Sequence, residues 1–388
     1  MKKVATADIV NTNVKILSQK LSFKKDFFGD APAPFIGRYG YPNVNVGVLS
    51  AIEAPNVEEL DAPRQWSAQN KGMNDIIGIR SSLINSRFQS SIYSKQEKLN
   101  LLAQEVGLSA KAAEVEINLK DSPAFKLQTD KYAPPRGPNA ELLKAAITSN
   151  TSVPTKVEKV HGDTDLKANE ALRILYSKGV GENHLSQILS VGAVGIGKNR
   201  KLVPTRWSIT ATDDTVGKQN IGYLKDFRQI DHYQIYFGGY LGNYYLICML
   251  PEVWSYELFE MHTQTPGRYS TDVEMYAGRK DYAETTAGGY YSVRLAITEH
   301  MLAMKRQGLA VAFRFITPEY SAPLGVWVTR EATRRALQSK PFTCYKREEF
   351  VKEANRIIKE HIDFDLDKLM SKSELIKLSK QQTKLFDF

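Results

Sequence analysis

The chain has 388 residues, which allows one large domain or two to three smaller ones. Its 52 basic side chains outnumber its 43 acidic ones and give a net charge of +9, which favours anionic partners such as nucleic acid. Two cysteines without a CxxC pair exclude a disulfide framework and a cysteine-based zinc site, and the six histidines form no ligand pair.

The apolar runs of the sequence are too short to span a membrane, and the N-terminus lacks the apolar core of a signal peptide. The low cysteine content also fits a reducing compartment. We therefore expect a cytoplasmic protein without a membrane partner.

Strands and helices alternate in the first half of the sequence. Residues 1–30 are polar and basic, and Val44 and Val46 alternate with asparagines as in a half-buried strand. The stretch 151–160 is a short candidate linker. Further elements expected in this half are a helix over 99–106, a strand over 115–119 and a helix over 140–147.

The second half opens with two predicted helices, over 165–177 and 182–190, and the glycines between them allow a helix-turn-helix interpretation. From Thr205 the sequence becomes rich in strand-forming residues. Gly242-Asn243, between two aromatic and apolar runs, predicts a β-hairpin. The expected elements are strands over 233–241, 244–250, 254–261, 309–316 and 325–328, and helices over 286–307, 330–338 and 347–361.

Together these elements predict an α+β fold, with an antiparallel sheet packed against helices and an extended or flexible C-terminal tail. The sequence shows no internal repeats. The expected organisation is a polar basic segment (1–30), a core (31–340) with a sub-boundary near 151–160, C-terminal helices (341–370) and a tail (371–388).

The C-terminal peptide has the spacing of a motif that plugs a sliding clamp. Gln382, Leu385 and Phe388 lie three residues apart, and positions three apart eclipse in a 3₁₀ turn, so the leucine and the phenylalanine would project together. A capping box, Ser371 to Glu374, would start a short helix before it. The alternative is that the apolar side chains complete the core. The whole candidate segment is Gln381, Gln382, Thr383, Lys384, Leu385, Phe386, Asp387 and Phe388.

Arginines beside aromatic residues are suited to phosphate contact combined with base stacking. Asp213 and Asp214 are candidate ligands for a divalent metal, with Asp272 and Glu274 as a second acidic pair, although Asp213 would equally cap a helix starting near 215. No cofactor is predicted, and no spacing identifies a catalytic nucleophile. The candidate DNA or ligand pocket comprises Arg38, Tyr39, Tyr41, Asn43, Asn45, Arg80, Arg206, Trp207, Asp213, Asp214, Arg279, Tyr290, Tyr291 and Arg294.

Several uncommon strings occur in order along the chain: GRYGYPNVNVG at 37–47, LVPTRWSIT at 202–210, TAGGYY at 286–291 and the terminal peptide. In these strings the chain resembles the archaeal Nre family of DNA-repair proteins, from about residue 37 to 331 and again at the last residues. The resemblance implies a DNA-damage-response protein that binds the sliding clamp PCNA through residues matching Gln382, Leu385 and Phe388.

Many members of that family carry a cysteine-rich N-terminal segment that looks like a zinc finger. The equivalent stretch here, from Asn11 onward, has no cysteine, so no zinc is expected.

Two functions remain open from the sequence. The first is a clamp-recruited DNA-repair factor with a basic, aromatic surface that touches DNA. The second is an enzyme that acts on DNA or a nucleotide through a pocket of arginines, tyrosines and aspartates. A scaffold without chemistry would need no pocket. Whether the family strings converge on one cleft separates these hypotheses.

Overall fold

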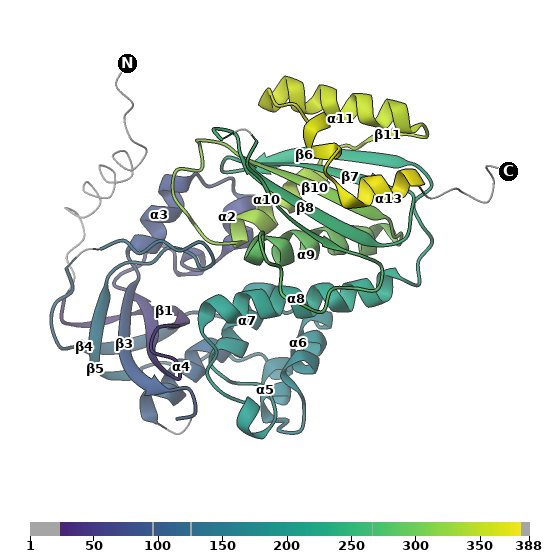
Figure 1. Cartoon of the computed structure of the whole chain (residues 1–388). Coiled ribbons are helices and arrows are strands. Elements are labelled where there is room, and N and C mark those ends of the chain that lie inside the picture. The colour runs from purple at the N-terminus through teal and green to yellow at the C-terminus, as the bar shows by residue number, and fades with distance from the viewer. Residues whose placement is uncertain (1–23, 95–96, 125, 266, 382–388) are drawn as a thin grey trace, which may run out of the picture. The chain divides into compact units, whose positions relative to one another are not determined.

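The computed structural model describes residues 24–94, 97–124, 126–265 and 267–381 and divides the chain into two compact units. Unit 1 comprises Met1–Val216 and Ser321–Trp327, and unit 2 comprises Gly217–Tyr320 and Val328–Phe388. Each unit combines helices with its own sheet, which confirms the predicted α+β class (Figure 1). Most of the predicted clamp motif, residues 382–388, lies outside the described residues.

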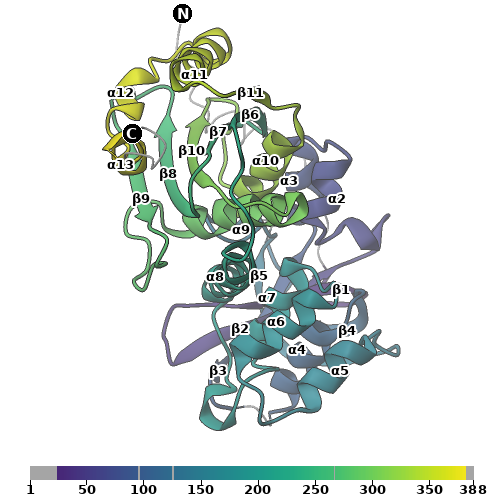
Figure 2. The same ribbon diagram turned by 90° about the vertical axis from the view of Figure 1, so that its right-hand side faces the viewer.

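Unit 1 is built around a closed barrel with the strand order β1-β2-β3-β5-β4. β3 and β5 are parallel and the other neighbours are antiparallel, and the helix α4 (Lys98–Leu108) connects β3 to β4 (Figure 2). This topology is that of an OB-fold. The strands are β1 (Asp26–Ile36), β2 (Asn43–Ala51), β3 (Ile84–Ser91), β4 (Ala113–Leu119) and β5 (Asn139–Ile147).

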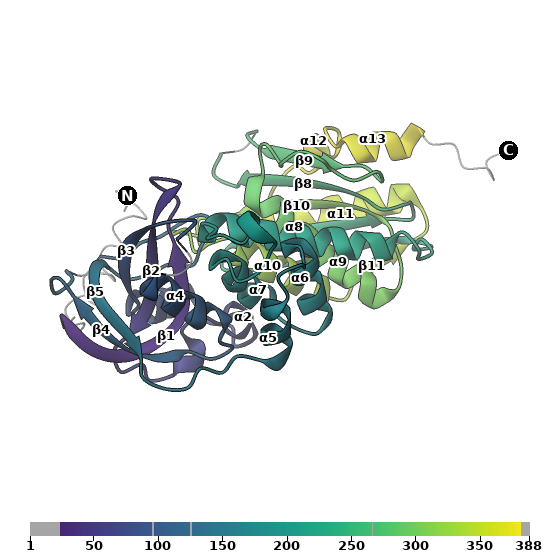
Figure 3. The same ribbon diagram turned by 90° about the horizontal axis from the view of Figure 1, so that it is seen from below.

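Alternation along β2 determines which side chains fill the barrel. Val44, Val46 and Val48 are fully buried in the core, so the residues between them face outwards. This confirms the predicted strand. The helix α4 lies against β1 and β2 and adds Leu102 and Val106 to the same core (Figure 3).

The predicted helix over 140–147 is wrong, because this segment is β5. Backbone pairing with β4 and β3 outweighs the helix propensity of its alanines, leucines and lysine. Part of the candidate linker is also helical. Besides α4, the described helices that lie wholly in unit 1 are η1 (Val57–Glu59), α2 (Pro63–Ala68), α3 (Met73–Ser81), α5 (Thr155–Gly162), α6 (Ala168–Ser177), α7 (Glu182–Ser190) and η2 (Gly197–Asn199).

A long helix, α8 (Thr205–Leu224), replaces the strand-rich structure predicted from Thr205. The carbonyl of Pro204 accepts the N–H of Ser208 at 3.0 Å and starts the helix. Ser208, Thr212 and Val216 are fully buried at a spacing of four, which is a helical pattern made mainly by small polar residues. The sequence interpretation missed it because that stripe is not apolar.

Unit 2 contains a six-stranded sheet with the order β11-β6-β7-β10-β8-β9. The predicted hairpin is confirmed, but its turn is shifted by one residue from the predicted Gly242-Asn243. Leu241 and Gly242 form the turn in the left-handed region (φ of 50° and 69°), and Asn243 is the first residue of β7. The predicted strand near 254–261 is also present, but it pairs parallel with β10 and antiparallel with β9. The strands are β6 (Tyr233–Tyr240), β7 (Asn243–Leu250), β8 (Ser255–His262), β9 (Ser270–Glu274), β10 (Leu309–Ile316) and β11 (Phe342–Cys344).

Helices cover both faces of this sheet, with α11 over one face and α9 over the other (Figure 1). The strand predicted over 325–328 is wrong, because α10 begins at Trp327. Among the described residues, no helix combines the length and the apolarity that a membrane span requires. The helices are α9 (Ala287–Met304), α10 (Trp327–Gln338), α11 (Arg347–Ile362), α12 (Asp367–Met370) and α13 (Glu374–Gln381).

The capping box predicted from Ser371 to Glu374 is shifted in the structure. Helix α13 begins at Glu374, and the hydroxyl oxygen of Ser373 accepts the N–H of Ile376 at 3.1 Å. The same hydroxyl donates to the carboxylate of Glu257 on β8 at 2.5 Å. Ser373 is therefore the capping residue, and it ties the start of α13 to the sheet.

Asp272 on β9 holds the segment that leads into α9. Its carboxylate accepts the N–H groups of Glu284 (2.9 Å), Thr285 (2.9 Å) and Thr286 (2.7 Å) and pairs with Arg279 at 3.0 Å. Burial acts to raise the pKa of Asp272, but the hydrogen bonds outweigh it and hold the pKa below its ordinary value. The charged carboxylate is thus the form that stabilises the fold.

Replacement of Asp272 by asparagine should lower the free energy of unfolding at pH 7 by about 2 kcal/mol, the range for hydrogen bonds to a charged group. Because the folded-state pKa lies below the unfolded value, this stabilisation is present above about pH 4 and is lost as the pH falls through the folded-state pKa. In urea unfolding, the difference in the free energy of unfolding between Asp272→Asn and the wild type should be smaller at pH 3 than at pH 7. The exposed Asp281→Asn is the control, and a difference that stays constant with pH would contradict the assignment.

Candidate nucleic-acid interface

The predicted pocket residues divide between the two units, and each group is described within its own unit. Those in unit 1 are Arg38, Tyr39, Tyr41, Asn43, Asn45, Arg80, Arg206, Trp207, Asp213 and Asp214. Those in unit 2 are Arg279, Tyr290, Tyr291 and Arg294.

The loop between β1 and β2 presents aromatic side chains to solvent. Tyr39 is 76% exposed and Tyr41 is 43% exposed. The turn closes through a hydrogen bond from the N–H of Asn43 to the carbonyl of Gly40 (2.9 Å), and the φ of +83° at Gly40 is one that glycine tolerates. Arg38 stacks on Tyr39, with 4.8 Å from its guanidinium carbon to the ring centroid.

The second family string lies beside this loop. The hydroxyl of Thr205 accepts the N–H of Ile36 at 2.9 Å, which fixes the start of α8 at the end of β1. Trp207, on the first turn of α8, is 44% exposed, and its ring centroid lies 5.3 Å from that of Tyr41. Residues far apart in the sequence therefore form one exposed aromatic pair.

A lysine joins this pair. The ammonium of Lys201 lies 3.4 Å from the hydroxyl oxygen of Tyr41 and 5.5 Å from the ring centroid of Tyr93, although Lys201 and Tyr41 are 160 residues apart in the sequence. The sequence interpretation missed Lys201 and Tyr93. Lys201 directly precedes a family string, but Tyr93 carries no such signal. We call this group the aromatic–basic surface: Arg38, Tyr39, Tyr41, Tyr93, Lys201 and Trp207.

Three further candidates lie on or near the barrel. Asn43 and Asn45 are on the outward side of β2, where they oppose Ser91 and Gln89 of β3. Arg206 stacks on a tyrosine of the β4–β5 connection, with 3.6 Å between its guanidinium carbon and the ring centroid of Tyr132. In OB-folds the face of the second and third strands and the loops β1–β2 and β4–β5 bind oligonucleotides.

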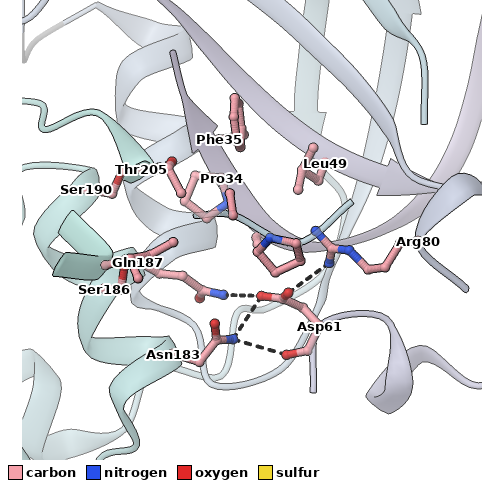
Figure 4. A pocket seen from close by; sticks show the side chains of 14 residues that line it. Pro34, Phe35, Leu49, Asp61, Arg80, Asn183, Ser186, Gln187, Ser190 and Thr205 are labelled. Atoms are coloured by element: carbon pink, nitrogen blue, oxygen red, sulfur yellow. Dashed lines mark hydrogen bonds and ion pairs between the residues drawn. The ribbon is translucent and has the colours of Figure 1, made fainter. Parts of the chain in front are cut away.

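Arg80 has a different environment from the other arginines of this set, because it lines a pocket of unit 1 (Figure 4). Its Nη1 donates to the carboxylate of Asp61 and to the carbonyl of Leu60, each at 2.8 Å. The other carboxylate oxygen of Asp61 accepts from Asn183 (2.9 Å) and Gln187 (2.8 Å) of α7. Burial lowers the pKa of Arg80, and Asp61 counteracts it.

This cluster joins α3 to α7, so its polar groups stabilise the fold of unit 1. Removing one member of a buried ion pair typically destabilises a protein by about 3–5 kcal/mol. Because α7 is held here through Asn183 and Gln187, it is packed as a scaffold helix and not presented as a recognition helix.

Asp213 and Asp214 lie well inside α8, so the expectation that Asp213 caps a helix near residue 215 is wrong. Asp213 is buried and Asp214 is half-buried. Over the ranges that the structure describes, no group of three or more His, Cys, Asp or Glu side chains is placed to hold a metal ion.

The candidates of unit 2 come together in its interior. Arg294 pairs with Glu274 at 2.6 Å, and the hydroxyl of Tyr290 donates to the same carboxylate at 3.0 Å. Burial and then the charge of Glu274 raise the pKa of Tyr290. The guanidinium carbon of Arg294 also lies 5.4 Å from the ring centroid of Tyr291. Tyr290, Tyr291 and Arg294 of α9 thus belong to a buried network and not to an open surface, with the partly buried Arg279 paired to Asp272 beside it.

Comparison with known proteins identifies the family. The sequence profile described as "Archaeal Nre, N-terminal" matches residues 5–266, and "Archaeal Nre, C-terminal" matches residues 274–388. DNA repair protein NreB of Archaeoglobus fulgidus is 34% identical over 381 residues, which cover 96% of this chain and 94% of that protein. DNA repair protein NreA of Haloferax volcanii is 32% identical over 375 residues, covering 93% and 88%. No solved structure shows significant similarity. The chain belongs to the archaeal Nre family.

Proposed function

We propose that this protein is a DNA-repair factor that holds single-stranded DNA on the aromatic–basic surface and is recruited to the sliding clamp by its C-terminal motif. The role in repair is supported by the names of its relatives. The observation that carries the DNA contact is the exposed pair of Tyr41 and Trp207 with Lys201 beside it, at the loop that OB-folds use for oligonucleotides.

The chemistry of this surface suits an unpaired strand. Bases of single-stranded DNA can stack on exposed rings such as Tyr41 and Trp207, whereas bases in a duplex are stacked on one another. Lys201 lies at the hydroxyl of Tyr41, and Arg38 stacks on Tyr39 of the same loop, so both cations are available to contact the phosphates of a stacked strand. The net charge of +9 further attracts the polyanion at a distance.

The outer face of the barrel continues this surface with uncharged polar groups. Asn43 is opposite Ser91 and Asn45 is opposite Gln89, so amides and a hydroxyl line adjacent strands. Such side chains donate and accept hydrogen bonds with bases or sugars without demanding a particular sequence. The proposed contact is therefore tolerant of sequence.

The proposed recruitment rests on the family resemblance and on the spacing of Gln382, Leu385 and Phe388. The helix before the motif is firmly attached to unit 2. Glu257 of β8 accepts the N–H groups of Glu374 (3.0 Å) and Leu375 (3.2 Å) in addition to the hydroxyl of Ser373. The motif thus follows a helix with a fixed attachment point.

Alanine at Tyr41 or Trp207 should each weaken the binding of a short oligothymidylate by roughly 5- to 150-fold, the range for loss of one base–aromatic stack. Fluorescence anisotropy at a fixed salt concentration measures this. Tyr345→Ala removes a 78% exposed tyrosine of unit 2 and serves as the matched control. Affinity that is the same for all three variants and the wild type would exclude the aromatic–basic surface as the DNA contact.

Removal of Gln382–Phe388, or alanine at Leu385 and Phe388 together, should abolish binding to PCNA in titration calorimetry, because both apolar anchors of the motif are lost. Lys384→Ala lies between the anchors and should bind nearly as the wild type does. If the truncated chain still bound PCNA with unchanged affinity, the clamp contact would have to lie elsewhere.

A further inference from the structure

Arg136, in the connection between β4 and β5, has buried nitrogens without partners. Its Nε and Nη1 are shielded from solvent and make no hydrogen bond within the described ranges. Its guanidinium carbon lies 3.9 Å from the ring centroid of Phe35. A buried donor without a partner is destabilising by about 1–3 kcal/mol, and such groups commonly mark a bound ion or water.

The backbone holds this side chain against the barrel. Arg136 exchanges two hydrogen bonds with Gln128, at 2.8 and 3.0 Å. The next residue, Gly137, donates to the carbonyl of Leu83 at 2.8 Å, and a Cβ at Gly137 would lie only 2.4 Å from the carbonyl oxygen of Ser81. The backbone is therefore pressed onto the start of β3, which fixes where the Arg136 side chain leaves the chain.

A second unpaired arginine lies on the same face of the barrel. Phe35, Gly47 and Arg87 are directly opposite one another on β1, β2 and β3. The side chain of Asn85 occupies the space above Gly47, where a Cβ would lie 1.9 Å from its amide oxygen. Arg87 makes neither an ion pair nor a side-chain hydrogen bond with any described residue.

Two other arginines act on the charge of Arg136. The acidic residue opposite Arg87, Glu141 of β5, pairs with Lys120 at 3.1 Å. Burial lowers the pKa of Arg136 to about 10, Asp130 counteracts this effect, and the charges of Arg80 and Arg87 lower the pKa further. Arg80 is already neutralised by Asp61, at 2.8 Å. An anion beside Arg136 and Arg87 would relieve this repulsion and accept the unpaired N–H groups.

We propose that Arg136 and Arg87 form a phosphate-binding site on the outer face of the barrel, beside Phe35. Guanidinium groups match the geometry of phosphate oxygens and form charge-assisted hydrogen bonds with them. The stacking of Arg136 on Phe35 fixes the plane of its donors. The site goes beyond the aromatic–basic surface, because a phosphate ion alone is enough to fill it.

The test is thermal unfolding of the full chain with increasing inorganic phosphate, with chloride adjusted to keep the ionic strength constant. A ligand that binds only the folded state raises Tm. We expect phosphate to raise Tm of the wild type and of the exposed-site control Arg306→Gln. Arg136→Gln and Arg87→Gln should bind phosphate about 10- to 150-fold more weakly, the range for loss of a hydrogen bond to a charged group.

The variants also distinguish binding from a structural role. Without phosphate, Arg136→Gln should be at least as stable as the wild type, because it removes a buried cation without a partner. If Arg136→Gln is less stable than the wild type and its phosphate response is unchanged, a water between Arg136 and Asn85 Oδ1, which also lacks a donor, explains the unpaired groups, and the site is overturned. An equal rise of Tm in all four proteins would reflect general exclusion of phosphate from protein surfaces and would overturn the site. Arg87→Gln, at a half-exposed position, decides the question if Arg136→Gln fails to fold: a phosphate response unchanged from the wild type overturns the site.

Two further ligands identify the source of the phosphate. If thymidine monophosphate, but not thymidine, raises Tm in an Arg136-dependent way, the site accepts a mononucleotide. If only oligothymidylate does so, the phosphate belongs to a DNA strand. The proposal is overturned if inorganic phosphate does not raise Tm and if neither thymidine monophosphate nor oligothymidylate raises it in an Arg136-dependent way. Tyr41→Ala and Trp207→Ala should keep the rise of Tm with phosphate. The phosphate site can therefore be confirmed even if these two variants show that the aromatic–basic surface does not bind DNA.

Discussion

Closure of the barrel is the constraint on which the candidate interface of unit 1 depends. The interior of a small barrel is filled by side chains. Here they are apolar and include Val44, Val46 and Val48 of β2. Because side chains alternate across a strand, Asn43, Asn45 and Gly47 must then face outwards. Closure also pairs β1 with β4, which leaves no free edge between them. The outward positions of β2 at this end are therefore two asparagines and a glycine, and the β1–β2 loop is bounded on both sides by paired strands.

Local patterns predicted the elements that local physics determines. The hairpin at Leu241–Gly242, the strand β10 and the helix α7 follow from turn chemistry and apolar spacing. The barrel could not be predicted, because β1–β4 and β3–β5 pairing joins segments distant in sequence. Helix α8 was missed because its buried stripe is polar, and β5 because its composition favours a helix. The family strings located Tyr41 and Trp207, whereas their contact, and the role of Lys201 and Tyr93, required the structure.

The arginines show why composition alone could not separate structural from functional charge. Arg80, Arg294 and Arg314 are buried and each meets a carboxylate, from Asp61, Glu274 and Glu260, within 2.8 Å. The charge of each of these arginines is neutralised by a carboxylate within the fold. Arg38 is exposed and stacks on Tyr39, and Arg136 is half-buried without a carboxylate at bonding distance. What distinguishes the two classes is the partner of each guanidinium, which is a property of the folded chain.

The aromatic–basic surface and the site at Arg136 are connected by β2. The outward positions of this strand run from Asn43 through Asn45 to Gly47, which is opposite Phe35, the ring on which Arg136 stacks. Asn43 and Gly47 are four positions apart on β2, so this stretch of extended strand is about 13 Å long. OB-folds bind about 4 or more nucleotides of single-stranded DNA. A strand with one base on the Tyr41–Trp207 pair would follow the amides of β2 towards Arg136, and its backbone would supply the phosphate that this arginine lacks.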